Sequence, residues 1–220
     1  LLKTCILKIE EVGSGAKFKP SKEYISSLMG YIEGIRNACM TEDAAATKYG
    51  IDGNQPKVAR EYFEQLRKSN AVDFTGLLSE TLRLFRENPA VRDVYRSRFL
   101  FISVDEVQDT NIAQYQLIKD LGLGHGNVLV VGDLDQSIYK FRSANPENIL
   151  AFEKDFPSCV VLKLEKNYRS TPSILKYSQN LISHNLLRKD TSLTTDNPDG
   201  SEPRIVAGKT DLEMARIMAE

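Results

Sequence analysis

Two adjacent carboxylates, Asp105 and Glu106, follow the apolar run of residues 99–103. This run predicts a buried strand, and in open α/β sheets ligands bind at the carboxyl ends of the strands. At such a place Asp105 could hold Mg²⁺, directly or through water, and Glu106 could orient or deprotonate an attacking water. The pair is therefore suited to metal–nucleotide chemistry, and a solvated acidic strand end is the alternative for the pair alone.

Two later segments carry polar and aromatic residues after apolar runs. Residues 128–144 read VLVVGDLDQSIYKFRSA, and residues 164–171 read LEKNYRST. Together with VDEVQDTN at residues 104–111, they resemble in order motifs II, III and IV of superfamily 1 DNA helicases, most closely the UvrD/Rep/PcrA family. The resemblance is plain from about residue 73 to about residue 185, and three long strings in the family's order make it specific.

The resemblance implies roles for the acidic pair and for two nearby glutamines. Asp105 matches the family's magnesium ligand, and Glu106 matches its catalytic base, which positions water in line with the γ-phosphate of ATP. Gln136 matches the glutamine that senses the γ-phosphate, which a neutral amide can do through a hydrogen bond. Gln108 matches the nucleotide-site glutamine of the DExQ string, whose amide could relay between the nucleotide and motif III.

The third segment implies contacts from a second domain. The family stacks the tyrosine at Tyr168 on adenine and uses the arginine at Arg169 on the γ-phosphate, which is an arginine-finger arrangement. Taken alone, Asn-Tyr-Arg would be an unremarkable loop in which Asn167 and Ser170 shape a turn.

An aromatic and basic cluster of Tyr139, Phe141 and Arg142 follows Gln136. In an extended segment the two rings would share one face, and aromatic rings stack on unpaired bases with little sequence preference. Core aromatics are the alternative, but the match to motif III favours binding of single-stranded DNA. Ser143 stands where the family has glycine, which changes the freedom of the backbone.

Other polar residues near the motifs are expected to shape the backbone. Asp109 and Thr110 are predicted to cap a helix that starts at Asn111 or Ile112. Asp133 is predicted to support the turn after the second strand.

Two upstream features are less specific. The string DFTGLL, which starts at Asp73, is similar to the family's DFDDLL, with Thr75 and Gly76 in place of two acids. Near the N-terminus, five lysines form either a duplex-facing patch or, as we favour, a solvated face. These are Lys3, Lys8, Lys17, Lys19 and Lys22.

The elements that must position these residues alternate between strand and helix from residue 99 onward. Strands are predicted at 99–104, 127–131 and 159–164, and helices at 112–121, 146–155 and 172–184. This alternation predicts an α/β fold with a parallel sheet. A loop follows at 190–203, and a final helix begins near Asp211.

The first 70 residues read as mainly helical. Apolar residues recur at helical spacing within residues 21–40, and Ser21 is the candidate N-cap. A loop is predicted at residues 50–56 and a second helix at 57–69. Two more helices are expected, one at residues 77–86 and one that begins at Pro89.

The resemblance implies a RecA-like, P-loop NTPase type of sheet interrupted by a helical insert. Residues 1–70 would be most of helical subdomain 1B, residues 71–163 the C-terminal half of RecA-like domain 1A, and residues 164–220 the start of RecA-like domain 2A. The chain starts at Leu1 rather than Met, which indicates an excised piece of a longer protein. No GxxxxGK[ST] phosphate loop occurs in it, since Val12 to Lys17 has the wrong spacing.

Composition limits the class of protein to which the chain can belong. The 220 residues are 41% hydrophobic and 27% charged, which is ordinary for a globular protein, and the net charge of −1 leaves DNA binding to local patches. Three cysteines without a CxxC pair indicate a reducing compartment and no structural zinc. The sequence has neither an apolar stretch of membrane-spanning length nor a signal-peptide layout.

The resemblance implies a cytoplasmic, ATP- and Mg²⁺-dependent single-stranded DNA translocase or helicase, which unwinds duplex DNA in repair or replication. Its partners would be single-stranded and duplex DNA and repair or replication proteins, with no membrane. This piece would be inactive alone. Two alternatives stay open: a non-catalytic helicase-like module that binds single strands or a partner, and a helicase–nuclease subunit of the RecB or AddA kind.

Overall fold

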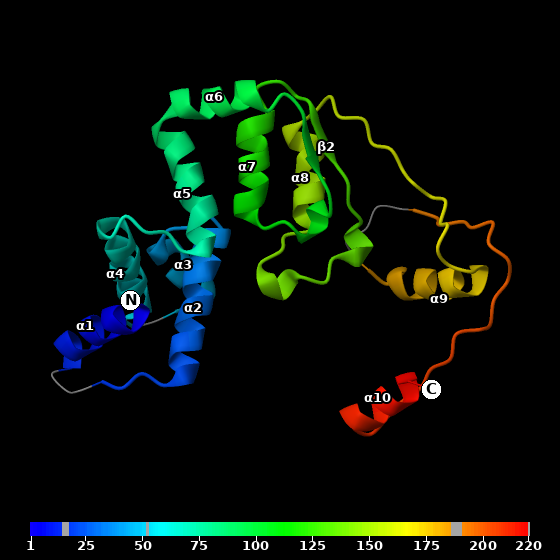
Figure 1. Ribbon diagram of the computed structural model, residues 1–220, viewed down its shortest axis with the longest axis horizontal. Coiled ribbons are helices and arrows are strands. Elements are labelled where there is room, and N and C mark those ends of the chain that lie inside the picture. The colour runs from blue at the N-terminus through cyan, green and yellow to red at the C-terminus, as the bar shows by residue number, and fades with distance from the viewer. Residues whose placement is uncertain (15–17, 52, 186–190, 220) are drawn as a thin grey trace. The chain divides into compact units, whose positions relative to one another are not determined.

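The computed structural model describes residues 1–14, 18–51, 53–185 and 191–219 (Figure 1). The chain forms two compact units, Leu1–Cys159 and Val160–Glu220. The larger unit contains a helical region and an α/β region, and the described part of the smaller unit carries two further helices.

The helical region begins with four helices (Figure 1): α1 (Leu2–Ser14), α2 (Lys22–Asn37), α3 (Glu42–Tyr49) and α4 (Gln55–Lys68). Ser21 caps α2 as predicted, because its hydroxyl oxygen accepts the backbone N–H of Tyr24 at 3.1 Å. The apolar faces meet in one core, which holds Cys5, Ile6, Leu28, Tyr31, Ile32, Ile35, Ala45, Val58, Ala59, Tyr62, Phe63 and Leu66.

Two local details of this region differ from the sequence prediction. Helix α3 was not expected, since its polar sequence has little amphipathic pattern, although Thr41 caps it through the N–H of Ala44. The predicted loop at residues 50–56 ends early, because α4 starts at Gln55 with Pro56 in its first turn, where proline suits a helix.

Helices α5 (Phe74–Glu87) and α6 (Pro89–Arg98) connect the helical region to the α/β region. Helix α5 contacts α2 on one side and α7 on the other, so it joins the two parts of the unit. Both helices confirm the sequence prediction, including the start of α6 at Pro89.

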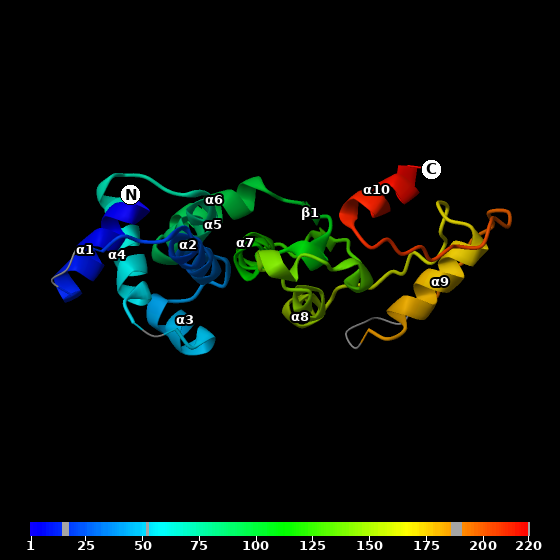
Figure 2. The same cartoon turned by 90° about the horizontal axis from the view of Figure 1, so that it is seen from below.

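The α/β region contains a parallel pair of strands, β1 (Ile102–Val104) and β2 (Val128–Val130), in the register Ile102 to Val128. Helix α7 (Ile112–Gly122) links them, and α8 (Glu147–Asp155) follows β2; the two views show both helices beside the strands (Figures 1 and 2). Val128 and Val130 pack against a small aromatic cluster of Tyr115, Phe152 and Phe156. The predicted parallel α/β arrangement is therefore present as a small two-stranded sheet.

The third predicted strand, at residues 159–164, is wrong. These residues form no strand, and the side chains of Val160, Leu162 and Leu164 are exposed. A strand needs a neighbour to take its backbone hydrogen bonds. In the described part of the smaller unit, pairing of this kind occurs only at a single parallel bridge between Lys166 and Thr194.

The smaller unit contains α9 (Pro172–Ile182) and α10 (Asp211–Ala219). Both were predicted, with α9 ending two residues before the expected boundary at 184. Asn167 donates its N–H to the carbonyl of Thr194 at 2.7 Å, which ties the segment before α9 to the segment after it.

Candidate functional site

The acidic pair lies directly beyond the carboxyl end of β1, as predicted. Both side chains are exposed, and Asp105 Oδ1 accepts the backbone N–H of Glu106 at 2.9 Å. Glu106 has φ 50 and ψ 42, a left-handed conformation that costs a residue with a side chain about 1–2 kcal/mol. Such strained positions persist only where surrounding contacts impose them, and they cluster at functional sites.

Gln108 supplies the main contact that holds Glu106. Its side chain is 1% exposed, and its Nε2 donates to Glu106 Oε2 at 2.6 Å. Its Oε1 accepts the backbone N–H of Asp133, which follows β2, at 3.1 Å. A Cβ atom at Gly132 would lie 2.5 Å from Gln108 Oε1, so this position needs glycine for the amide to fit. One buried side chain therefore joins the ends of both strands.

The turn after β2 brings Gln136 into the same set of contacts. Asp133 precedes a short 3₁₀ helix, η2 (Leu134–Gln136), and its Oδ1 accepts the N–H of Asp135 at 3.0 Å. Its Oδ2 accepts from Gln136 Nε2 at 2.8 Å. The prediction that Asp133 supports the turn is confirmed. Hydrogen bonds thus run from Glu106 through Gln108 and Asp133 to Gln136.

The predicted caps of α7 were wrong, because the helix is capped one residue later. Asn111 Oδ1 accepts the N–H of Gln114, and the side chain of Gln114 accepts the N–H of Asn111, both at 2.9 Å. Thr110 instead donates its hydroxyl to the carbonyl of Val107, inside the turn that carries motif II. Asp109 lies in that 3₁₀ turn, η1 (Val107–Asp109), where its backbone cannot serve as the helix cap.

Sequence reasoning missed a buried asparagine in α8. Asn148 is buried, and its Nδ2 donates to both the carbonyl and the hydroxyl of Thr110 at 3.0 Å. Its neighbour Asn145 donates a backbone N–H to the same carbonyl at 2.9 Å. The available signal was weak: Asn148 is the second residue of α8, beside Glu147, and precedes the apolar run at 149–152. These contacts fasten motif II to the helix that follows motif III.

The aromatic residues after Gln136 are exposed, but their segment is not extended. Lys140–Arg142 forms a 3₁₀ helix, η3, so the predicted alternation of faces is wrong. The rings of Tyr139 and Phe141 are nevertheless neighbours, with centroids 5.9 Å apart. Phe141 is 81% exposed, which excludes it from the core of this unit. The side chain of Arg142 lies outside the described part of the chain.

Ser143, where the family has glycine, has φ 66 and ψ 18. This left-handed conformation is the one that glycine adopts without steric cost, so serine here is mildly strained. The serine that replaces the family's glycine therefore lies at a position whose backbone conformation favours glycine.

Tyr168 and Arg169 lie in the smaller unit, on a turn shaped as predicted by Asn167. The Asn167 side-chain oxygen accepts the N–H of Arg169 at 2.9 Å and that of Ser170 at 2.7 Å. Tyr168 is 77% exposed, with Lys166 Nζ 5.5 Å from its ring centroid, and Arg169 is exposed. Both side chains are available to a ligand, and their expected approach to the acidic pair stays a prediction.

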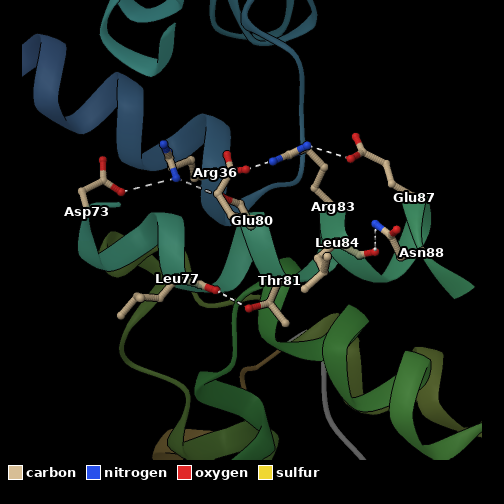
Figure 3. A network of polar contacts seen from close by, with 10 residues as sticks. Arg36, Asp73, Leu77, Glu80, Thr81, Arg83, Leu84, Glu87 and Asn88 are labelled. Atoms are coloured by element: carbon tan, nitrogen blue, oxygen red, sulfur yellow. Dashed lines mark hydrogen bonds and ion pairs between the residues drawn. The ribbon is translucent and has the colours of Figure 1, made fainter. Parts of the chain in front are cut away.

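The upstream DFTGLL string has a structural role here (Figure 3). Asp73 caps α5, because its Oδ1 accepts the N–H of Gly76 at 2.7 Å. The same oxygen lies 3.4 Å from Nη1 of buried Arg36, whose guanidinium also donates to Ser79 and covers the ring of Phe63. A Cβ atom at Gly76 would collide with this guanidinium. Glycine in place of the family's acid therefore makes room for an arginine that joins α2 to α5.

Among the described N-terminal lysines, Lys8 forms an ion pair with Glu61 at 2.6 Å. This contact favours the solvated-face interpretation for Lys8. Lys17 lies outside the described residues.

The donor atoms at the acidic pair fit magnesium that arrives with a nucleotide. Within the residues that the structure describes, no group of three or more His, Cys, Asp or Glu could enclose a metal ion. Mg²⁺ in nucleotide sites needs only one or two carboxylates beside phosphate oxygens and water. The exposed carboxylate of Asp105 meets that requirement.

Of the helices described, none is both long and apolar enough to cross a membrane.

Comparison with known proteins gives a consistent result. Residues 9–157 match the family model described as the UvrD/REP helicase N-terminal domain. The ATP-dependent DNA helicase PcrA of Bacillus subtilis is 38% identical over 203 residues, which are 91% of this chain and 27% of that protein. PcrA of Staphylococcus aureus is 39% identical over 97% of this chain, and PcrA of Staphylococcus epidermidis is 37% identical over 98%. The chain spans 29% of the length of each of these last two relatives.

Proposed function

Because the chain belongs to the UvrD/REP helicase family, we propose that it is a segment of an ATP-dependent DNA helicase. The whole protein would move along single-stranded DNA and unwind duplex DNA in repair or replication, in the cytoplasm. The segment carries the water-activating part of the ATP site but no phosphate loop, so the 220 residues alone are not expected to hydrolyse ATP.

The observation that supports this proposal most is the joining of the strand ends. Asp105 and Glu106 follow β1, Gln136 follows β2, and Gln108 bonds to both sides. ATP hydrolysis needs a metal ligand, a group that positions water, and a group that detects the γ-phosphate. In the proposed site Asp105 holds Mg²⁺, Glu106 positions the water, and Gln136 contacts the γ-phosphate.

The smaller unit would complete the nucleotide site from a second domain. In this proposal Tyr168 stacks on adenine and Arg169 contacts the γ-phosphate. The exposure of both side chains on the turn before α9 supports the assignment. The domain boundaries proposed are residues 1–70 for 1B, 71–163 for the second half of RecA-like 1A, and 164–220 for the start of RecA-like 2A.

Single-stranded DNA would contact the η3 segment. Phe141 presents an open ring beside Tyr139, and an aromatic face stacks on unpaired bases without sequence preference. Arg142 would meet a phosphate. Because this segment follows Gln136 within a few residues, movement of the nucleotide sensor can reach the DNA contact through a short length of chain.

A strand-displacement assay tests the proposed function. The full-length protein that carries this segment should release a labelled strand from a tailed duplex when ATP and Mg²⁺ are present. A non-hydrolysable ATP analogue should support no release. If single strands bind but ATP hydrolysis and strand release are both absent, the non-catalytic module is the correct function. An additional DNA-cleaving activity would place the protein with the helicase–nucleases.

A further inference from the structure

Two neighbouring residues at the end of α2 each contact the N-cap of another helix. Arg36 forms an ion pair with Asp73, which caps α5 (Figure 3). The side-chain oxygen of Asn37 accepts a hydrogen bond from Nδ2 of Asn111, which caps α7, at 3.1 Å. This second contact spans 74 positions of sequence and reaches the last residue of motif II. It is a direct polar connection from the helical region to the segment that carries the proposed catalytic base.

Asn111 uses both polar atoms of its side chain. Its Oδ1 accepts the N–H of Gln114 in the capping box, and its Nδ2 donates to Asn37. Asn111 is 9% exposed, so its Nδ2 has little access to water that could replace Asn37. A buried donor without an acceptor is costly, so removal of the Asn37 oxygen favours a shift of Asn111 from its present place.

The motif II turn can carry such a shift to Glu106. Only residues 107–110 separate Glu106 from Asn111, and they are tightly closed. Thr110 donates both its hydroxyl, at 2.6 Å, and its backbone N–H, at 3.1 Å, to the carbonyl of Val107. Glu106 itself has φ 50, a conformation that persists only where surrounding contacts impose it. The bond from Asn37 is one of these contacts, and it comes from outside the α/β region.

A second support keeps this segment folded when the contact from α2 is lost. Asn148 of α8 donates to the carbonyl of Thr110 at 3.0 Å and to that of Asn111 at 3.4 Å. These bonds hold the backbone and do not involve the side chain of Asn111. Loss of the Asn37 contact should therefore move the end of the turn without unfolding it, and the expected effect is on the rate of hydrolysis.

We propose that Asn37 is a positioning residue for ATP hydrolysis: its bond to Asn111 sets the end of the motif II turn and, through that turn, the place of Glu106. The inference rests on the proposed function, which gives Glu106 its role. It adds that the helical region, from which none of the proposed ATP-site residues comes, sets the rate of hydrolysis through the last residue of α2.

Asn37→Leu in the full-length protein is the first test, because leucine has a similar size and no acceptor. Turnover is measured with saturating single-stranded DNA and divided by the number of sites that bind a fluorescent ATP analogue, so that unfolded protein is not counted. This kcat should fall by about 5- to 50-fold, since a misplacement of 1 Å costs up to about 100-fold. The KM for ATP should change less than about threefold, because no proposed nucleotide ligand is altered.

Asn37→Asp is the conservative variant that should restore the rate. Aspartate has an oxygen at the same place, which can still accept from Nδ2 of Asn111. Its kcat should stay within about twofold of the wild type. A loss as large as that of Asn37→Leu would show that the acceptor is not what matters, and would overturn the proposal.

Asn54→Leu is the matched control. Asn54 is the N-cap residue of α4, and its Nδ2 donates to Glu10 across 44 positions at 3.2 Å, within the helical region. Removal of this bond should leave kcat per ATP-binding site at the wild-type value. Urea denaturation gives the unfolding midpoint of both leucine variants. Equal losses of kcat in the two variants would mean that any weakened bond in the helical region slows turnover, and would remove the specific role of Asn37.

A double-mutant cycle tests the bond itself and keeps the test valid if Asn37→Leu does not fold. Asn111→Ser retains an oxygen that can cap α7 but is too short to reach Asn37. If the two residues act through one bond, each single variant should slow kcat, and the double variant should cost no more than about twofold beyond the larger single effect. Losses that multiply would show independent roles and overturn the proposal. A wild-type protein that hydrolyses no ATP would overturn the proposed function instead, so the two failures are distinct.

Discussion

The four-helix region α1–α4 and the segment around β1 and β2 belong to one compact unit, yet different kinds of side chain hold them together. The helical region buries apolar residues from all four helices in a continuous core. The α/β region has a smaller cluster, formed by Tyr115, Phe152 and Phe156. Its buried polar side chains make directed contacts instead: Gln108 and Asn148 bond to the turns that carry motifs II and III, and Asn111 caps α7.

The two kinds of contact contribute differently to stability and to the positions of single atoms. Apolar burial is non-directional and grows with area, so it stabilises a region without fixing single atoms. Buried amides bond at defined angles and become costly when a partner is lost, so they specify where backbone and side chains lie. A site that must place a carboxylate within a fraction of an ångström benefits from the second kind of contact.

The largest effect that follows concerns the helical core. Ile32 is 1% exposed, so Ile32→Ala in the 220-residue chain should lower the free energy of unfolding by about 2–5 kcal/mol. Leu129→Ala, at an exposed position of β2, should change it by less than about 0.5 kcal/mol. Urea denaturation followed by circular dichroism measures both. Equal losses would mean that apolar stabilisation is not concentrated in the helical core.

The next expected effect is on the affinity for single-stranded DNA and not on the stability of the fold. Phe141→Ala in the full-length protein should weaken binding of single-stranded DNA by about 1–3 kcal/mol, the usual contribution of one base–aromatic stack. Its unfolding midpoint should not move, because the ring is 81% exposed. Phe101→Ala, at an equally open phenylalanine outside the motifs, is the control and should leave affinity unchanged.

Fluorescence anisotropy with a labelled oligonucleotide over a salt series measures these affinities. In the same series Arg142→Ala should lower the salt slope by about one, if that residue contacts a phosphate. Loss of folding in Phe141→Ala, or equal affinity for the wild type and this variant, would remove Phe141 from the DNA surface.

The smallest effect concerns a single backbone position. Ser143→Gly should stabilise the 220-residue chain by at most about 1 kcal/mol, because glycine relieves the strain at φ 66 but also gains freedom in the unfolded chain. Ser143→Ala keeps the Cβ atom and should bring no gain. Urea denaturation compares the two, and a gain in the alanine variant would show that strain is not the cause.

The same contrast explains what the sequence could predict. Ser21 as the cap of α2, the helices α5 and α6, and the acids beyond β1 all depend on neighbouring residues and on periodic apolar patterns. These local signals were sufficient. The strings of motifs II and III also pointed to Asp105, Glu106 and Gln136, each of which follows a strand in the structure.

Most of the misses involve partners that are distant in sequence, and one is local. Asn148 bonds Thr110 across 38 positions, and no periodic pattern announces such a contact. Asp109 was expected to cap α7, but the 3₁₀ turn of motif II moves the cap to Asn111. The apolar run at residues 159–164 resembles a strand, although strand formation depends on a pairing neighbour rather than on composition.

The most direct test of the account is the ATPase activity of Glu106→Gln in the full-length protein. The substitution keeps the size of the side chain, and its amide oxygen can still accept the hydrogen bond from Gln108, but it cannot act as a base. Steady-state turnover should fall by about 10²–10⁴-fold while ATP binding persists. Glu147→Gln, at an exposed glutamate of α8, should retain wild-type turnover. Near-normal turnover in Glu106→Gln would contradict the assignment of the catalytic base at the end of β1.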